Sequence, residues 1–339
     1  MKKTFVSLFI AAAALVACNK EQGPASSVVP SGEKVDLTVG VSGKGITKIT
    51  GIKGDNTDEA KVNSLQVFVF NGETLDGYVS AANSLTATVE CTAGTREVFA
   101  VVNADDLSSV VTSRTALMSQ VSSLGSTVSD FEMIGTKTDE ITKGSDMTIE
   151  VDRFAARVVV KKVTNALSSG LASQTFTIKS IHINNVAADV DYGFSSAYTV
   201  DHWYHQTAFQ ASNTISGIIA DKPEATVAAG SSYSTAHYFY AYPNDEAMSI
   251  ADAWSPRRTT VVLKVQIGDT LYDYPIILPE LDSNHSYEID EIKITRPGNK
   301  DDGEEGGEDE QKPVDGADCS FTIIVNPWTV VAVTEGTTI

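Results

Sequence analysis

The sequence predicts an all-β protein made of antiparallel β-sandwich domains. Three observations lead to this prediction. Short segments alternate apolar and polar side chains with the period of a strand, turn residues separate them at regular intervals, and helical spacing is confined to one short segment. Many short strands with regular turns are typical of sandwiches. The pattern alone does not distinguish a sandwich from a barrel.

The first half of the chain supplies the clearest strand signals. Val35–Ser42 alternates apolar side chains with small or polar ones, and Lys61–Phe70 ends at Asn71-Gly72, a strong hairpin signal. Further predicted strands are Ser84–Cys91, Arg96–Asn103, Met147–Val151 and Ala155–Val163. Ser113–Leu124 has apolar residues near helical spacing and is the predicted short helix.

A polar break of small residues at Asn165–Ser173 is the predicted domain boundary. We therefore expect one sandwich at residues 34–164 and a second at residues 165–298. The strands predicted for the second sandwich are Thr175–Ile183, Ala236–Ala241, Thr259–Ile267, Thr270–Ile277 and Tyr287–Ile294.

The N-terminus has the features of an export signal. Lys2 and Lys3 precede the apolar run Phe5–Val16, which has signal-peptide length and is too short to span a bilayer. Leu15-Val16-Ala17-Cys18 resembles a bacterial lipobox. The prediction is a lipoprotein signal peptide at residues 1–17, lipid on Cys18, and a tether at residues 18–33 that holds the protein at the outer membrane.

The charge of the chain excludes one class of partner. The formal net charge is −19, and nucleic acid requires basic patches, so no nucleic-acid partner is expected. Part of this charge lies at residues 299–318, an acid- and Gly-rich stretch predicted to be a flexible, solvated linker. A calcium site is not expected there, because the Asp-x-Asp-x-Asp-Gly spacing is absent.

The last segment, residues 319–339, looks like a strand without a sheet of its own. Ser320–Val333 is rich in β-branched and aromatic residues, which suit a half-buried pleated surface. It follows a linker that cannot fold by itself, so it needs an acceptor. If the acceptor is another copy of the chain, the protein polymerises.

Enzymatic chemistry is not expected. Gly40–Lys44 lacks the final glycine of a nucleophile elbow, and no Gly-rich loop ends in the Lys-Ser or Lys-Thr that cradles phosphate. His202 and His205, with Asp201, are the best metal candidates, but Trp203 and Tyr204 between them favour an aromatic patch. Neither a metal nor a cofactor is predicted. Cys91 and Cys319 either form a disulfide or remain free thiols.

Four segments in a fixed order carry a family resemblance. They are the lipobox-like Leu15–Cys18, the predicted strand and turn in Asp58–Glu73, Leu281–Tyr287 leading into Ile292–Gly298, and Val325–Val331 near the C-terminus. In their order and spacing these segments resemble the fimbrillins, the FimA- and Mfa-like lipoprotein pilins that form the major (shaft) subunits of type V pili of Bacteroidetes.

The resemblance implies two transthyretin-like, Ig-like sandwiches that assemble by donor-strand exchange in an extracellular fimbria. In that family a protease cuts the loop after the first strand, the strand leaves with the lipid, and a neighbour's C-terminal strand fills the groove. Here the departing strand would be Val35–Ser42 and the candidate cleavage sites Lys44, Lys48 and Lys53. The candidate donor residues are Phe321, Ile323, Val325, Trp328, Val330 and Ala332, with a kink expected at Asn326-Pro327.

One departure from the family keeps the role open. The family's processing site usually carries Arg, whereas the first Arg in this chain is Arg96. The resemblance therefore implies a subunit that joins other pilins, in a homopolymer or a mixed fibre, to mediate adhesion. If the first strand stays in place, the protein is instead a lipid-anchored fimbrial anchor or a tip adhesin for a host or bacterial surface ligand.

Overall fold

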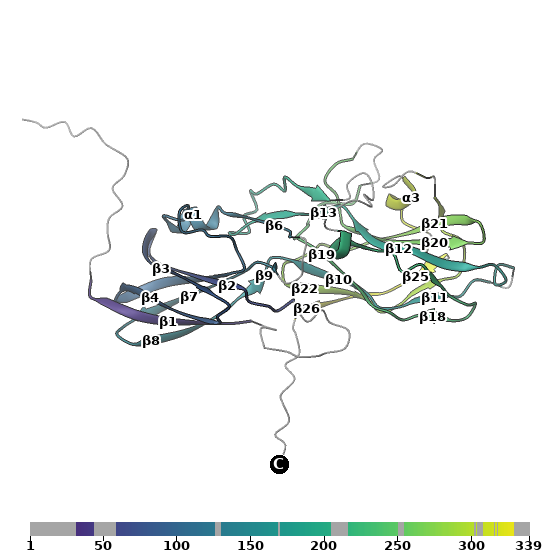
Figure 1. Ribbon diagram of the computed structural model, residues 1–339. Helices are drawn as coiled ribbons and strands as arrows, with labels where there is room; N and C mark the ends of the chain where they lie inside the picture. Colours follow the sequence, from purple (N-terminus) through teal and green to yellow (C-terminus); the bar gives the residue numbers. More distant parts are fainter. Residues whose placement is uncertain are drawn as a thin grey trace, which may run out of the picture.

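The structure is a computed structural model that describes residues 32–43, 59–125, 130–168, 170–204, 216–249, 254–301, 303, 308–314, 316 and 318–328. Within these ranges strands dominate. The helices there are the short α1 (Arg114–Met118), α2 (Ser216–Ile219) and α3 (Glu308–Gln311). The molecule is elongated, with β1 near one end and β20 and β21 near the other (Figure 1). The all-β prediction is confirmed.

Two sheets form the first half of the molecule. One has the order β4-β1-β8, with bounds Thr86–Thr92, Lys34–Ser42 and Ser145–Glu150. The other has the order β3-β2-β5-β7-β9, with bounds Thr74–Ala82, Ser64–Asn71, Gly94–Val102, Met133–Ile141 and Asp152–Arg153. A buried apolar cluster between them draws Leu37 and Ile149 from the first sheet and Val67 and Val98 from the second. The two sheets therefore form a sandwich.

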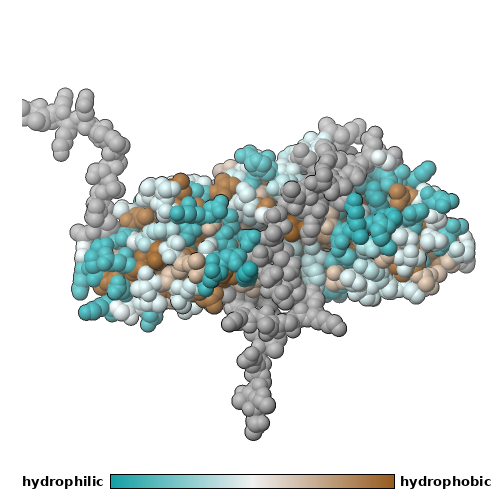
Figure 2. Space-filling view, in the orientation of Figure 1, coloured by the Kyte–Doolittle hydropathy of each residue, from teal (hydrophilic) through white to brown (hydrophobic). Residues whose placement is uncertain are grey.

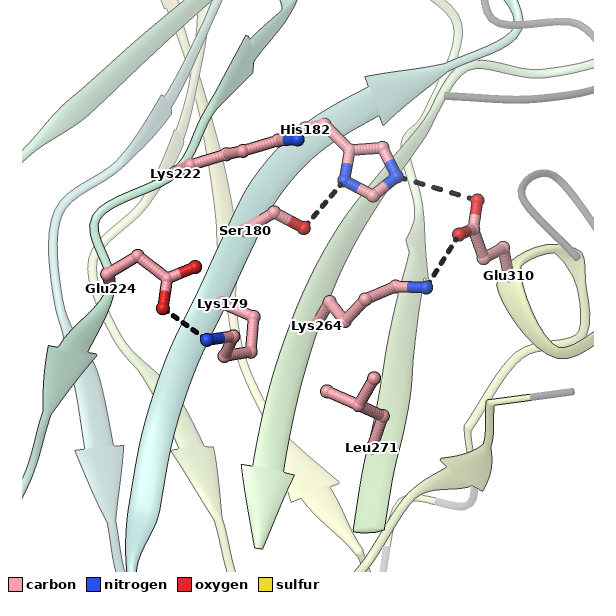
Figure 3. Close-up of a pocket in the computed structure, with 8 residues that line it drawn as sticks. All are labelled: Lys179, Ser180, His182, Lys222, Glu224, Lys264, Leu271 and Glu310. Carbon is pink, nitrogen blue, oxygen red and sulfur yellow. Dashed lines mark hydrogen bonds and ion pairs between the residues drawn. The ribbon is translucent and has the colours of Figure 1, made fainter. Parts of the chain in front are cut away.

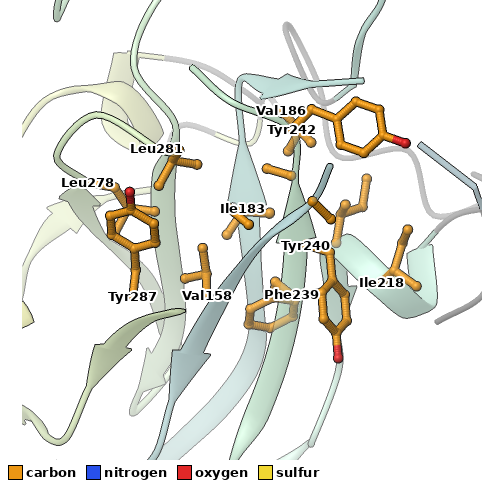
Figure 4. Close-up of a cluster of buried hydrophobic side chains, with 14 of the residues drawn as sticks. Val158, Ile183, Val186, Ile218, Phe239, Tyr240, Tyr242, Leu278, Leu281 and Tyr287 are labelled. Carbon is orange, nitrogen blue, oxygen red and sulfur yellow. The ribbon is translucent and has the colours of Figure 1, made fainter. Parts of the chain in front are cut away.

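The second half is also built from two facing layers. One layer begins with the order β19-β10-β22-β26, with bounds His237–Ala241, Ala156–Val160, His285–Ile289 and Ile323–Pro327. It continues into the order β18-β11-β23-β25, with bounds Ser232–Tyr233, Val163–Asn165, Ile292–Ile294 and Cys319–Ser320. The other layer is β16-β12-β20-β21-β24, with bounds Ala220–Asp221, Phe176–Asn184, Thr260–Ile267, Thr270–Ile277 and Asn299–Lys300, and with β17 (Ala225–Thr226) also on β12. Val158, Phe239 and Tyr287 pack towards Ile183 in the shared core (Figure 4).

The boundary predicted at Asn165 falls inside a sheet of the second half. β10 precedes that boundary, yet it pairs with β19 and β22. The halves are also joined by β14 (Asp189–Asp191), which pairs with β6 (Val121–Ser123), while β13 (Val186–Ala187) pairs with β15 (Trp203–Tyr204). Phe68 and Phe70 of β2 belong to the same core cluster as the second half. Small polar residues after Asn165 marked a loop, not the boundary.

Several strands differ from the sequence prediction. β1 runs parallel to β8, β10 to β22 and β11 to β23, because these partners are far apart in sequence and no hairpin fixes their direction. β3 and β7 were not predicted. The predicted helix Ser113–Leu124 is only α1, capped by the Ser113 hydroxyl, which accepts from the Ala116 N–H; β6 follows it.

Two glycines let the sheets of the first half approach closely at both edges. A Cβ on Gly77 of β3 would lie 2.5 Å from the Glu90 carbonyl oxygen of β4. A Cβ on Gly135 of β7 would lie 2.0 Å from the Glu150 carbonyl oxygen of β8. Backbone therefore meets backbone on either side of β1. Within the described ranges, no helix has the length and apolar character needed to cross a membrane.

Candidate functional site: the first strand and the C-terminal strand

β1 occupies the centre of its sheet. Its alternating sequence places Val35, Leu37, Val39 and Val41 in the core, each at most 7% exposed. Seven residues from Lys34 to Gly40 pair with β4, and Leu37–Ser42 pairs with β8. At its C-terminal end, the Val41 N–H donates to the Leu85 carbonyl and the Ser42 carbonyl accepts from the Val151 N–H. The first strand predicted from sequence is therefore confirmed.

Removal of β1 would change this sheet in two ways. The facing edges of β4 and β8 would lose their hydrogen-bond partners, because β1 is the only strand between them in the sheet order. The side chains now packed on β1, such as Val89 of β4 and Ile149 of β8, would line an apolar slot. Unpaired edges beside an apolar slot are the features that accept an added strand.

The segment after β1 holds the predicted cleavage sites. Lys44, Lys48 and Lys53 lie outside the described residues, as do Cys18 and the whole N-terminal signal region. The chain re-enters the structure at Glu59, whose side chain is buried although no sequence pattern marked it as a core residue. The structure therefore describes the strand before this segment, β1, and the residue after it, Glu59.

The C-terminal strand has a sheet in this structure, which corrects the prediction of a strand without one. β25 (Cys319–Ser320) pairs with β23, and β26 (Ile323–Pro327) pairs antiparallel with β22. β26 is thus the edge strand of the second half (Figure 1). It was missed because a strand pattern does not reveal which sheet edge it joins. Val330 and Ala332 lie outside the described residues.

This docking buries little of the strand. Phe321, Ile324 and Val325 are 39%, 40% and 46% exposed, and Ile323 is only partly buried. Phe321 and Val325 therefore fill no pockets in their own chain. The donor prediction concerns pockets in a neighbouring subunit. The expected kink at Asn326-Pro327 is wrong, because β26 stays paired through both residues; proline is tolerated at this sheet edge.

Trp328 anchors the strand from its C-terminal end. Its side chain is fully buried, its indole N–H donates to Glu59 Oε2 at 3.2 Å, and its backbone N–H donates to the Asn284 carbonyl at 2.8 Å. The guanidinium carbons of Arg153 and Arg157 lie 4.6 and 5.2 Å from the centre of the indole ring. Trp328 is therefore held by hydrogen bonds and by cation–π contacts.

Glu59 is the hub of this buried cluster. Its carboxylate accepts from Arg157 Nη1 at 3.0 Å and from the Tyr240 hydroxyl, and its backbone carbonyl accepts from Arg153 Nε at 3.0 Å. Burial lowers the pKa of Arg153 to about 10 and raises the pKa of Tyr240, with the Glu59 charge adding to the shift of the tyrosine. The cluster joins Glu59, where the chain resumes after the candidate cleavage segment, to Trp328 at the C-terminal end of β26, 269 residues away.

Asn284 supplies the backbone geometry for this contact. Its φ of 55° lies in the left-handed region, which asparagine tolerates better than most residues. Its N–H donates to the Ala155 carbonyl, and its side-chain oxygen accepts from Arg153 Nη1. Asn284 lies in the Leu281–Tyr287 segment that carried the family resemblance, as Glu59 lies in Asp58–Glu73 and Trp328 in Val325–Val331.

The linker before the tail is partly folded, which corrects the prediction of a solvated spacer. β24 pairs with β21, and α3 places Glu310 in a buried position against the β12–β20 surface. Glu310 Oε1 lies 3.2 Å from Lys264 Nζ, and Oε2 accepts from Asn184 and lies 3.5 Å from His182 Nε2 (Figure 3). Burial would raise the pKa of Glu310, but its hydrogen bonds and the nearby positive charges outweigh burial and hold it at about 2.

A shallow hollow adjoins this contact. It has a volume of about 200 Å³, and Lys179, Lys222 and Glu224 are among the residues that line it (Figure 3). Lys179 pairs with Glu224 across it. Hydrophilic side chains cover much of this end of the molecule, where α3, β20 and β21 lie (Figure 2). The hollow shows no arrangement typical of a catalytic site.

The other sequence candidates are separated from this site. Cys91 and Cys319 are free and buried in different core clusters, so they form no disulfide. Burial raises the pKa of Cys319 to about 12. His202 is largely exposed and contacts Asp189 at 2.5 Å through Nδ1, while His205 lies outside the described residues.

Comparison with known proteins finds a family similarity in part of the chain. Residues 34–184 match the family model described as major fimbrial subunit protein (FimA). Over these residues, somewhat less than half of the chain, the sequence is similar to that family. The family is one of structural fimbrial subunits and not of enzymes, and its members assemble with other pilin subunits at the cell surface. A search of curated proteins finds no match.

Several solved structures share the fold of this chain at low sequence identity. A proposed cell adhesion protein from Bacteroides eggerthii has a TM-score of 0.64 at 18% identity, covering 90% of this chain and 98% of its own. A fimbrilin (fimA) from Porphyromonas gingivalis has a TM-score of 0.61 at 15% identity, covering 88% and 99%. The tip fimbrial protein Mfa3 from the same species, with a C-terminal truncation, has a TM-score of 0.50 at 13% identity, covering 86% and 99%.

Proposed function

We propose that this protein is exported as a lipoprotein, is cut after β1, and polymerises by donor-strand exchange. The observation that carries the proposal is the central position of β1. Its removal would leave one slot flanked by two unpaired strand edges, and a strand from another subunit would restore both sets of hydrogen bonds.

The C-terminal strand is the candidate donor. Its present contact leaves Phe321, Ile324 and Val325 39–46% exposed, so Trp328 is the large apolar side chain that becomes exposed when β26 leaves the edge of β22. A slot that took up six apolar side chains of the tail, at ~1.5–3 kcal/mol each, would gain on the order of 10 kcal/mol before ordering costs. The tail strand is therefore expected to be more stable in the slot of a neighbouring subunit than at the edge of β22, once Trp328 leaves its site or another subunit's Trp328 takes its place.

Export and processing complete the proposal. Lipid on Cys18 would hold the precursor at the outer membrane, and cleavage after Lys44, Lys48 or Lys53 would free the body from the lipidated β1 segment. The cut chain would then join other pilin subunits in an extracellular fimbria that mediates adhesion.

A fimbrial anchor is the second candidate function. It is favoured by the absence of Arg before Arg96 and by the complete integration of β1 into its sheet. If β1 stays in place, the chain keeps its lipid and accepts no donor strand, although its own tail can still be donated. A tip adhesin also fits an uncut chain, with a host or bacterial surface molecule as its ligand.

The test compares cut and intact chains. Limited trypsin treatment opens the loop, and a variant with Lys44, Lys48 and Lys53 all changed to Gln serves as the uncut control. A fluorescent peptide of residues 319–339 is expected to bind the cut chain after β1 is displaced, and to bind the control at least ~10-fold more weakly. A scrambled peptide checks specificity. Equal binding of the tail peptide to both chains would refute strand exchange at β1.

A further inference from the structure

Three carboxylates from separate parts of the chain meet where the linker returns to the sheet. Asp273 lies on β21, Asp301 follows β24, and Asp309 lies in α3. One carboxylate oxygen from each lies within 4.8 Å of the others. The linker backbone packs tightly here, because a Cβ on Gly298 would lie 2.5 Å from the Asp273 carbonyl oxygen. The close approach therefore brings Asp301 and Asp309 to β21.

Asp273 is the observation that distinguishes this cluster from an ordinary acidic surface. Its side chain is 0% exposed, and within the described part of the chain neither of its carboxylate oxygens accepts a hydrogen bond. The Lys264 ammonium lies 3.5 Å from Oδ1. An ionised carboxylate buried without hydrogen bonds costs several kcal/mol, so a group that compensates it is required.

Lys264 does not supply this compensation alone. Its ammonium lies 3.0 Å from Asp301 Oδ2 and 3.2 Å from Glu310 Oε1, closer than it lies to Asp273. Asp309 adds a further carboxylate, and one of its oxygens accepts the Glu310 N–H at 3.1 Å. One ammonium thus contacts three carboxylates, and Asp309 adds a fourth negative charge beside Asp273 and Asp301.

We propose that Asp273, Asp301 and Asp309 bind a hard divalent cation, and that calcium is its expected identity. All three offer oxygen, which calcium and magnesium prefer, and no thiolate or imidazole takes part. Calcium accepts irregular geometry and 6–8 ligands, whereas magnesium demands a near-ideal octahedron. Asp301 is only partly buried, so water can complete the shell.

The bound ion would fasten the linker to the body of the protein. Asp301 and Asp309 bracket the stretch that leads from β24 to α3, and Asp273 belongs to the sandwich itself. Cation binding would therefore fix the point from which the C-terminal strand departs. The sequence did not predict this site because its three ligands are far apart in the chain. The only calcium pattern sought in the linker was the contiguous Asp-x-Asp-x-Asp-Gly spacing.

Calorimetry tests the site. We would titrate the chelator-treated chain with CaCl₂ and then MgCl₂, and follow thermal unfolding in parallel. The expected result is one calcium per chain, with a dissociation constant on the order of 0.1–1 mM as in extracellular calcium modules, a higher melting temperature and weaker magnesium binding. Absence of both saturable heat and a melting shift up to roughly 10 mM calcium would overturn the proposal.

Asp273→Asn provides the decisive variant, with Asp146→Asn, at an exposed position of β8, as the charge-matched control. Removing a buried carboxylate leaves Asp273→Asn folded and at least as stable as the wild type without calcium, but lowers its calcium affinity at least ~10-fold. The control keeps wild-type affinity. If Asp273→Asn bound calcium as tightly as the wild type does, Asp273 would not be a ligand. If Asp273→Asn were more stable while calcium did not bind to the wild type, a proton and not a cation would compensate Asp273. Either result would overturn the proposal.

Discussion

At the scale of single residues, Trp328 decides how firmly the C-terminal strand is held. The strand itself is exposed along most of its length, whereas the indole ring is fully buried between Arg153 and Tyr240, with Glu59 as its hydrogen-bond acceptor. Exchange of the strand therefore requires release of one side chain. That side chain contacts the residue at which the chain resumes after the candidate cleavage sites.

Trp328→Ala is expected to detach the tail. Truncation of a buried aromatic costs about 3–5 kcal/mol, and this loss falls on the docking of β25 and β26. Alkylation of Cys319, mapped by mass spectrometry, should accelerate at least ~10-fold, because its thiol belongs to β25 of the tail and is buried while the tail is docked. Cys91, in the other core, is the internal control. Phe321→Ala should change neither rate, and protection of Cys319 in Trp328→Ala would contradict the anchoring role.

Glu132 gives a prediction about pH. Burial raises the pKa of this carboxyl, and the hydrogen bond that Tyr192 donates to it at 2.7 Å offsets burial only partly. Because the folded-state pKa lies above the ordinary value of 4.5, the stability that Glu132 contributes is present below pH 4.5 and is lost as pH rises through the folded pKa.

Urea unfolding of Glu132→Gln across pH 4 to 7 checks this. The variant should gain stability relative to the wild type as pH rises, because glutamine carries no charge to bury. A difference that stays constant with pH would show that Glu132 ionises as freely in the folded protein as in the unfolded chain.

At the scale of elements, the first sandwich is shaped to hold one strand between two others. Gly77 and Gly135 bring β3 against β4 and β7 against β8 at the two edges, while β1 fills the middle of the smaller sheet. The glycines hold the walls of the slot in contact. They should therefore preserve the spacing of β4 and β8 when β1 is absent.

Gly135→Ala is expected to destabilise the protein by about 1–3 kcal/mol, because its Cβ would collide with the backbone of Glu150. Gly125→Ala is the matched control, since a Cβ there meets nothing within 4 Å. Chemical denaturation measures both. A Gly135→Ala variant as stable as the control would mean that the two sheets are free to move apart.

The sequence predicted elements whose burial follows their own pattern. β1, β2, β20 and β21 have a buried face or a buried run bounded by turns, and they appear close to their predicted bounds. β7 was missed because its middle is exposed and polar. The Glu59–Trp328 contact and the Asp273 cluster were missed because each joins residues from distant parts of the chain, and periodicity reports only the local environment.

At the scale of the whole molecule, the two proposed partners in strand exchange lie in different halves. The slot belongs to the first sandwich, and the tail leaves the second. A chain with its donor in one half and its acceptor in the other joins head to tail and forms an open fibre, as a heterologous interface does.

Deletion of residues 319–339 should abolish fimbriae while leaving the exported subunit folded. The body keeps its two sandwiches without the edge strand, so the monomer is expected to accumulate at the surface. Electron microscopy of the cell surface and immunoblotting of the subunit measure the two effects. Unchanged fibres in this deletion would exclude the tail as the donor.

The most direct test is the N-terminal residue of subunits in purified fimbriae, determined by mass spectrometry. Strand exchange at β1 predicts a start at Gly45, Ile49 or Gly54, after one of the three candidate lysines and without β1. A lipidated start at Cys18 throughout the polymer would mean that β1 stays in its sheet. The slot would then never open, and the proposed assembly mechanism would be wrong.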